Sequence, residues 1–145
     1  MSSRISTLHL KPWAIVLGCL ADFGVTLVGG IVITLIAFVN VGDPTDVAGL
    51  ESTLQGTGFQ AAGLVLGLLA TVLGGYLAAR KSPDAELTNA LAVGVVMTLL
   101  SVLLQVIFRT PFNLWSVIGF VTMIPAALGG GFLRVSQLEQ STATD

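Results

Sequence analysis

The residue best suited to chemistry in this chain is Asp22, a carboxylic acid inside an otherwise uncharged apolar stretch. The stretch runs from Trp13 to Val39 and contains no second charged residue. A bilayer crossing needs about 20 apolar residues, so this stretch is long enough to span a membrane. An ionisable group inside a membrane is costly, which makes Asp22 a candidate site for binding a proton or a cation.

Partners for Asp22 are predicted from its depth along the helix. Asp22 lies about 13 Å from Trp13 along a helix that rises 1.5 Å per residue. The same depth on the later apolar stretches predicts Thr71 and Thr98 beside it, with Pro125 at a similar level. Hydroxyl groups, and the carbonyl that a proline leaves without its usual donor, can hydrogen-bond a carboxyl group. No lysine or arginine lies at that depth, so the neutral acid is the expected form.

Two roles for Asp22 are compatible with these neighbours. As a structural acid, it would stay protonated and hydrogen-bond its helix to Thr71 or Thr98. As a functional acid, it would bind and release a proton or a cation during transport. From the sequence we favour the structural role, because no second titratable residue nearby can pass the proton on.

Other catalytic and binding chemistries lack the residues that they need. Cys19 is the only cysteine, which excludes an internal disulfide and a redox-active cysteine pair. His9 is the only histidine, which argues against bis-histidine haem and against a histidine-rich metal site. The apolar stretches contain neither a second deep acid for a carboxylate dyad nor a serine–histidine pair. We therefore expect no enzymatic activity, no cofactor and no metal ion.

The composition predicts a membrane protein that consists of one all-α domain. The 145 residues are 54% hydrophobic and 10% charged, whereas soluble domains carry about 25% charged residues. A net charge of −2, with no basic cluster beyond Arg80 and Lys81, argues against a nucleic-acid partner. Four antiparallel membrane helices are expected at residues 13–39, 59–79, 84–108 and 112–133.

The connection at residues 40–58 is the longest and the most acidic. It holds Asp43, Asp46 and Glu51 and contains no basic residue. Asp43 can cap a short helix whose first residue is Pro44, because proline is well placed in a first helical turn. We therefore expect a short surface helix between the first two membrane helices.

The basic residues predict how the chain is oriented. With a cytoplasmic N-terminus, the residues inside are Arg4, Lys11, Arg80, Lys81 and Arg134, and only Arg109 is outside. The positive-inside rule therefore places both termini in the cytoplasm and the acidic connection outside. The polar tail at residues 134–145 is expected to be disordered.

Small residues recur along each predicted membrane helix at four-residue steps. Membrane helices associate through close packing of such residues. The second helix carries a GxxxG motif, and its Leu-Gly-Gly at residues 73–75 recurs at residues 128–130. The glycines predicted to pack against neighbouring helices are Gly63, Gly67, Gly74, Gly75, Gly94, Gly129 and Gly130. This pattern favours packing surfaces over a substrate pathway.

Three glycine-containing segments carry a resemblance to known proteins: Leu20 to Thr26, Gly74 to Arg80 and Asn89 to Gly94. Through them the first three membrane helices resemble small four-span bacterial inner-membrane proteins of uncharacterised function. The resemblance implies a fold and a bacterial inner-membrane location, and it brings no activity and no catalytic residues.

Two functions remain open at this point. The one that the sequence favours is a non-enzymatic membrane protein that associates with itself or joins a larger membrane complex. The alternative is a small proton- or cation-coupled transporter that uses Asp22. Small multidrug-resistance transporters also have four spans and an embedded acid in the first. This chain departs from them in its strong basic-residue bias, its acidic first connection and its single aromatic neighbour of the acid, Phe23.

Overall fold

The computed structural model describes residues 10–43 and 45–142, and these residues form five helices. The helices are α1 (Pro12–Val41), α2 (Val47–Leu54), α3 (Thr57–Arg80), α4 (Glu86–Ile107) and α5 (Leu114–Thr142). Every helix except α2 is long and apolar enough to cross a membrane. The predicted all-α fold with four membrane-spanning helices is therefore confirmed.

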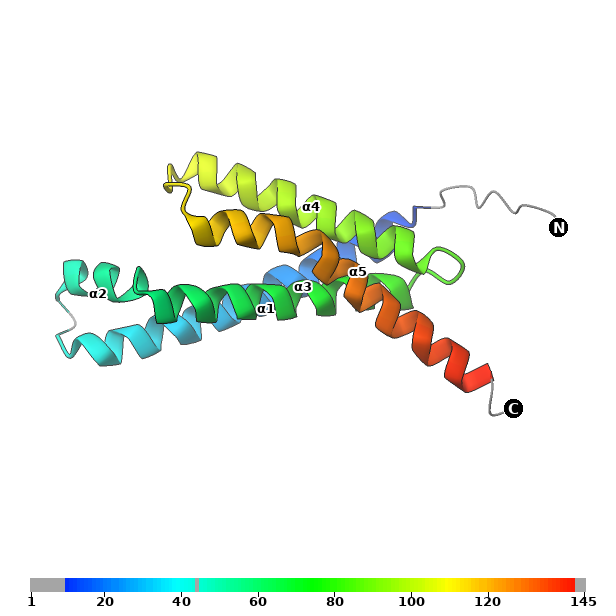
Figure 1. Ribbon diagram of the computed structural model, residues 1–145, viewed down its shortest axis with the longest axis horizontal. Helices are drawn as coiled ribbons and strands as arrows, with labels where there is room; N and C mark the ends of the chain where they lie inside the picture. The colour runs from blue at the N-terminus through cyan, green and yellow to red at the C-terminus, as the bar shows by residue number, and fades with distance from the viewer. Residues whose placement is uncertain (1–9, 44, 143–145) are drawn as a thin grey trace.

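The membrane-spanning helices form two hairpins that share one end of the molecule. α1 and α3 are joined through α2, and α4 and α5 are joined by a short turn (Figure 1). The hairpins diverge toward the α2 end and meet at the opposite end, where α5 crosses α3 (Figure 1). α3 contacts all the other helices, whereas α1 and α5 make no contact with each other within the described ranges. α3 is therefore the central helix of the bundle.

Glycines allow the close approach of α3 to α1 and α5. Gly18 and Gly74 face each other, and a Cβ atom added to either would lie 2.7 Å from the carbonyl oxygen of the other. A Cβ atom on Gly75 would collide with the backbone of Ala127, and one on Gly130 would collide with the backbone of α3. These contacts lie between backbones, so only glycine fits at these positions.

The seven glycines predicted to pack occupy two different environments. An added Cβ atom would be within 3.1 Å of a neighbouring helix at Gly74, Gly75, Gly94 and Gly130. No heavy atom lies within 4 Å of such an atom at Gly63, Gly67 and Gly129. The GxxxG motif therefore faces open space within this chain, although its spacing is the one that sequence reasoning associates most strongly with helix packing.

The start of α2 differs from the predicted cap. Asp46 caps the helix, because its Oδ1 accepts a hydrogen bond of 2.8 Å from the backbone N–H of Gly49. Asp43 instead accepts hydrogen bonds from the backbone N–H and the hydroxyl of Thr45, both at 2.8 Å. These two bonds lower the pKa of Asp43 below its ordinary value. Pro44, the predicted first helical residue, lies outside the described residues.

The last helix is longer than the sequence indicated. Asn113 caps its start by accepting a hydrogen bond of 2.8 Å from the N–H of Ser116. At its other end α5 continues through residues 134–142, which were expected to be disordered. No glycine or proline follows residue 131 to stop the helix. The hydroxyl of Tyr76 on α3 also donates to Gln137 at 2.9 Å and holds this segment to the bundle.

A buried asparagine fastens the start of α1 to α4. Asn89 is fully buried, and its Oδ1 accepts a hydrogen bond of 2.9 Å from the backbone N–H of Lys11. The Lys11 ammonium donates to the carbonyl of Pro83 at 3.3 Å in the turn before α4. The backbone N–H of Lys11 precedes the helix and has no intrahelical acceptor, so Asn89 supplies the acceptor that it needs.

Candidate functional site

Asp22 lies on α1 where this helix packs against α3, and it is 2% exposed. Gly74 of α3 makes room for it, since a Cβ atom there would lie 3.1 Å from the Asp22 Cβ. The Thr26 hydroxyl, one turn further along α1, donates to Asp22 Oδ1 at 3.3 Å. Asp22 Oδ2 is buried and has no hydrogen-bond partner among the residues that the structure describes. The carboxyl group is therefore only half satisfied.

Of the predicted partners, Thr71 is the one that the structure brings to Asp22. The Thr71 side chain is fully buried and interacts with the Asp22 carboxyl group. Its own hydroxyl proton is donated to the carbonyl of Gly67 at 2.9 Å. The Thr71 oxygen can therefore accept a proton from a neutral Asp22, but it has no second proton to offer an ionised one.

The other two residues predicted at this depth do not reach Asp22. The Thr98 hydroxyl donates to the carbonyl of Gly94 on its own helix at 2.8 Å, and no hydrogen bond joins it to Asp22. Pro125 lies on α5, and α5 does not contact α1 within the described part of the chain. Cys19, one turn before Asp22 on α1, is the titratable residue that interacts electrostatically with it.

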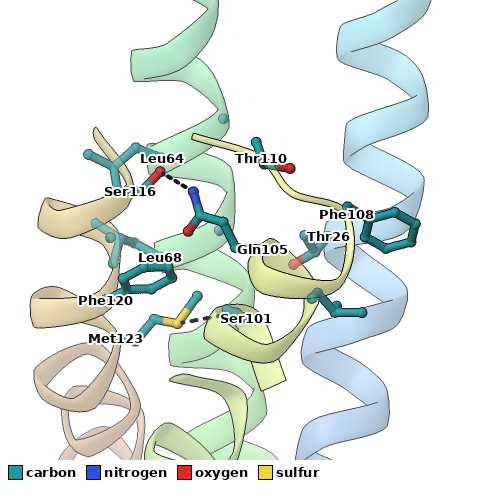
Figure 2. Close-up of a pocket in the computed structure, with 14 residues that line it drawn as sticks. Thr26, Leu64, Leu68, Ser101, Gln105, Phe108, Thr110, Ser116, Phe120 and Met123 are labelled. Carbon is teal, nitrogen blue, oxygen red and sulfur yellow. Dashed lines mark hydrogen bonds between the residues drawn. The ribbon is translucent and has the colours of Figure 1, made fainter. Parts of the chain in front are cut away.

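A cavity of about 400 Å³ lies between the hairpins, and Figure 2 shows residues that line it. Its wall residue on α1, Thr26, lies one turn beyond Asp22 in the direction of α2. All four membrane-spanning helices contribute to its wall, including Thr26 of α1, Gly67 of α3, Gln105 of α4 and Phe120 of α5. Binding sites for small molecules have volumes of about 300–1,000 Å³. Because Thr26 both lines the cavity and hydrogen-bonds Asp22, it connects the carboxyl group to the cavity.

Polar side chains of α4 and α5 close the cavity near the turn that joins these helices. Gln105 Nε2 donates to the Ser116 hydroxyl at 3.0 Å and to the carbonyl of Pro111 at 3.2 Å (Figure 2). The Ser116 hydroxyl in turn donates to Asn113 Oδ1 at 3.0 Å. Both amide protons of Gln105 are thus used near the α4–α5 turn. Gln105 Oε1 receives no hydrogen bond from the described residues and remains an acceptor for a ligand.

A second cavity of about 240 Å³ adjoins the first at the α2 end. Leu54 at the end of α2, Gln60 of α3 and Trp115 of α5 line it, and it shares Ser116 with the larger cavity. The residues that line the two cavities thus extend from the α2 end of the molecule to Thr26.

Sequence reasoning identified Asp22 and Thr71 but not the side chains around the cavity. Ser101 and Gln105 are four residues apart and therefore share a helix face, which was the available signal. Nothing in the sequence showed that this face meets Thr26 of α1 and Ser116 of α5 across an open space. That juxtaposition depends on how the two hairpins diverge.

No protein-family model matches this chain, and neither does any curated protein or solved structure. Within the described ranges, no three histidine, cysteine, aspartate or glutamate side chains come together in a group that could hold a metal ion. A functional assignment therefore depends on the geometry around Asp22 and the cavity.

Proposed function

We propose that this protein is a small non-enzymatic carrier of the bacterial inner membrane. In this carrier, Asp22 couples the binding of a proton or a cation to the movement of a ligand that occupies the cavity between the hairpins. The observation that carries this proposal is the buried and unpaired Oδ2 of Asp22, whose other oxygen is hydrogen-bonded to Thr26 in the wall of that cavity. A buried carboxylate oxygen without a partner is costly, so an ionised Asp22 needs a further partner for Oδ2, which a transported cation supplies. We therefore reverse the preference that the sequence alone suggested.

The neighbours of Asp22 suit two protonation states. An ionised carboxylate accepts the Thr26 hydroxyl hydrogen bond, as observed. A neutral Asp22 can donate its proton to the Thr71 oxygen, which is free to accept because the Thr71 proton goes to Gly67. The neutral acid thus has a partner for each oxygen, whereas the ionised form leaves Oδ2 without one, so loss of the proton favours the arrival of a cation.

Infrared difference spectroscopy of the protein in lipid nanodiscs tests whether Asp22 titrates. The carbonyl band of a protonated carboxyl group is separate from the bands of a carboxylate. We expect a band that appears and disappears reversibly between about pH 5 and pH 9 in the parent protein and is missing in Asp22→Asn. An Asp22 band that stays constant over this range would return the residue to a structural role.

We further propose that both termini lie in the cytoplasm. The start of α1, the α3–α4 turn and the end of α5 share one end of the molecule, opposite α2 (Figure 1). Arg80, Lys81 and Arg134 belong to the shared end, and the positive-inside rule makes this end cytoplasmic. The acidic α2 end then faces the outside.

Cysteine labelling in intact cells checks this orientation. In a Cys19→Ser background, a membrane-impermeant thiol reagent should label Glu51→Cys, because Glu51 is exposed on α2. It should label Lys81→Cys only after the cells are permeabilised. Labelling of Lys81→Cys in intact cells, with Glu51→Cys protected, would mean the opposite orientation.

Self-association is a second proposal, and it rests on the exposure of α1. Only 6% of the residues in the most apolar part of α1 are buried, the lowest share among the four spans. No heavy atom lies within 4 Å of a Cβ atom added to Gly24 or Gly30, so a helix of a second copy can approach there. The mass of the detergent-solubilised particle measures this association directly.

A further inference from the structure

Two oxygens of the cavity wall, those of Gln105 and Thr26, are free as acceptors only. Both amide protons of Gln105 are used in the α4–α5 turn, which leaves Oε1 facing the cavity (Figure 2). The Thr26 proton is directed at Asp22, which leaves the Thr26 oxygen to accept. Ser101 has only a weak contact of 3.9 Å with the sulfur of Met123. A ligand that satisfies the Gln105 and Thr26 oxygens must therefore supply donors, whereas the other hydroxyl groups can donate or accept.

The charges around the cavity favour a cation. None of the described residues that line the cavity is a lysine, arginine or histidine. At the α2 end the described chain carries Asp43, Asp46 and Glu51, against a single base, Arg109, in the turn between α4 and α5. Asp43 is held in its ionised form by the bonds from Thr45 that lower its pKa. The acids at the α2 end outnumber the base, so the field at this end of the molecule favours cations over anions.

The rest of the cavity wall is apolar and partly aromatic. Leu64 and Leu68 of α3 and Phe120 of α5 lie together on one side of it (Figure 2). Phe120 is held edge-to-face against Phe112, with ring centroids 6.2 Å apart. Such walls suit an apolar group of the size of a benzene ring, and an aromatic face also attracts a nearby cation.

We propose that the ligand is an organic ammonium ion with free N–H groups and an apolar body. Its N–H groups donate to Gln105 Oε1 and to the Thr26 oxygen, and its positive charge is balanced by the carboxylate of Asp22. This proposal rests on the proposed carrier function. When the ion binds to a neutral Asp22, the O–H bond of the carboxyl group breaks, one proton leaves to solvent, and the site keeps its total charge. One proton is therefore exchanged for each ammonium ion.

Calorimetry on the purified full-length protein with four matched compounds tests this ligand class. The compounds are 2-phenylethylammonium, its N,N,N-trimethyl derivative, neutral 2-phenylethanol and anionic 3-phenylpropanoate. We expect the primary ammonium ion to bind at least about tenfold more tightly than the other three, since a well-placed charged hydrogen bond is worth about 1.5–3 kcal/mol. Titration in two buffers of different ionisation enthalpy should show proton release with this compound.

A variant of the cavity provides an independent check. Gln105→Leu removes the acceptor at similar volume and should weaken binding of the primary ammonium ion by about tenfold. Gln55→Leu is the matched control, because Gln55 is exposed, directly follows α2 and lines neither cavity. Equal affinity for the trimethyl derivative would overturn the role of the N–H donors even if Gln105→Leu failed to fold.

The outcomes distinguish this inference from the carrier function. Preferential binding of 2-phenylethanol or 3-phenylpropanoate that is lost in Asp22→Asn would overturn the ammonium ligand and leave the carrier proposal standing. Binding of 2-phenylethylammonium that is equally tight in Asp22→Asn, without proton release in either protein, would overturn both. Failure of all four compounds to bind would overturn the ligand class, while the infrared titration of Asp22 would still report on the carrier.

Discussion

Replacing Gly75 with leucine is expected to disrupt the crossing of α3 and α5, whereas the same replacement at Gly129 is expected to be tolerated. A Cβ atom at Gly75 would meet the backbone of Ala127, and a backbone cannot move aside as a side chain does. Overpacking against movable side chains costs about 1–3 kcal/mol, so we expect Gly75→Leu to reach or exceed the upper end of this range. Gly129 has no heavy atom within 4 Å of its added Cβ and is the matched control.

Thermal denaturation in detergent, followed by circular dichroism, measures the difference between these variants. Gly67→Leu separates packing from binding, because Gly67 has open space around it but lines the cavity. We expect Gly67→Leu to keep its thermal stability while its side chain fills part of the cavity and blocks the ligand. Equal destabilisation by Gly75→Leu and Gly129→Leu would mean that the crossing of α3 and α5 differs from the one described.

The length of the apolar stretches was sufficient to predict the helices, but it was not sufficient to predict how they face one another. Four-residue steps placed Gly67 and Gly75 on one surface of the second span. The structure separates their roles, since a Cβ atom at Gly75 would meet the backbone of α5, whereas one at Gly67 would have no heavy atom within 4 Å. Crossing angles depend on the whole set of interhelical contacts, which no single motif contains.

Depth along the membrane predicted only one of the neighbours of Asp22, because depth does not determine which helix faces meet. Depth placed Thr71, Thr98 and Pro125 at the level of Asp22, and only Thr71 is brought beside it. Depth says nothing about rotation around the helix axis, which directs Thr98 to a carbonyl of its own helix. It also says nothing about which helices are neighbours, and α5 lies on the far side of α3 from α1.

The cap of α2 shows the limit of local patterns as well. Asp43 and Asp46 both precede the helix and both have the side chain that a cap requires. Thr45 decides between them, because its N–H and hydroxyl engage Asp43 and leave Asp46 to cap the helix. Such competition between two adjacent turns is settled by geometry rather than by residue type.

Two substitutions of Asp22 are expected to differ in their effect on the stability of the protein. In Asp22→Asn, the amide oxygen keeps the hydrogen bond from Thr26, and the amide nitrogen can donate to the oxygen of Thr71. Both polar atoms then have a partner, so we expect Asp22→Asn to be at least as stable as the parent protein. Asp22→Leu loses these bonds and should be destabilised by about 1–2 kcal/mol.

Transport by Asp22→Asn is expected to be lost although this variant folds as well as the parent protein. In vesicles with a gradient of 2-phenylethylammonium, the parent protein should drive a counterflow of protons that a pH-sensitive dye detects. Asp22→Asn should abolish this flux although it folds normally, because an amide neither releases a proton nor balances a cation. Proton flux at the parental rate in Asp22→Asn would show that the carboxyl group only joins helices. Loss of flux in a variant of undiminished stability assigns the coupling to the charge of Asp22, because the packing around it is then unchanged.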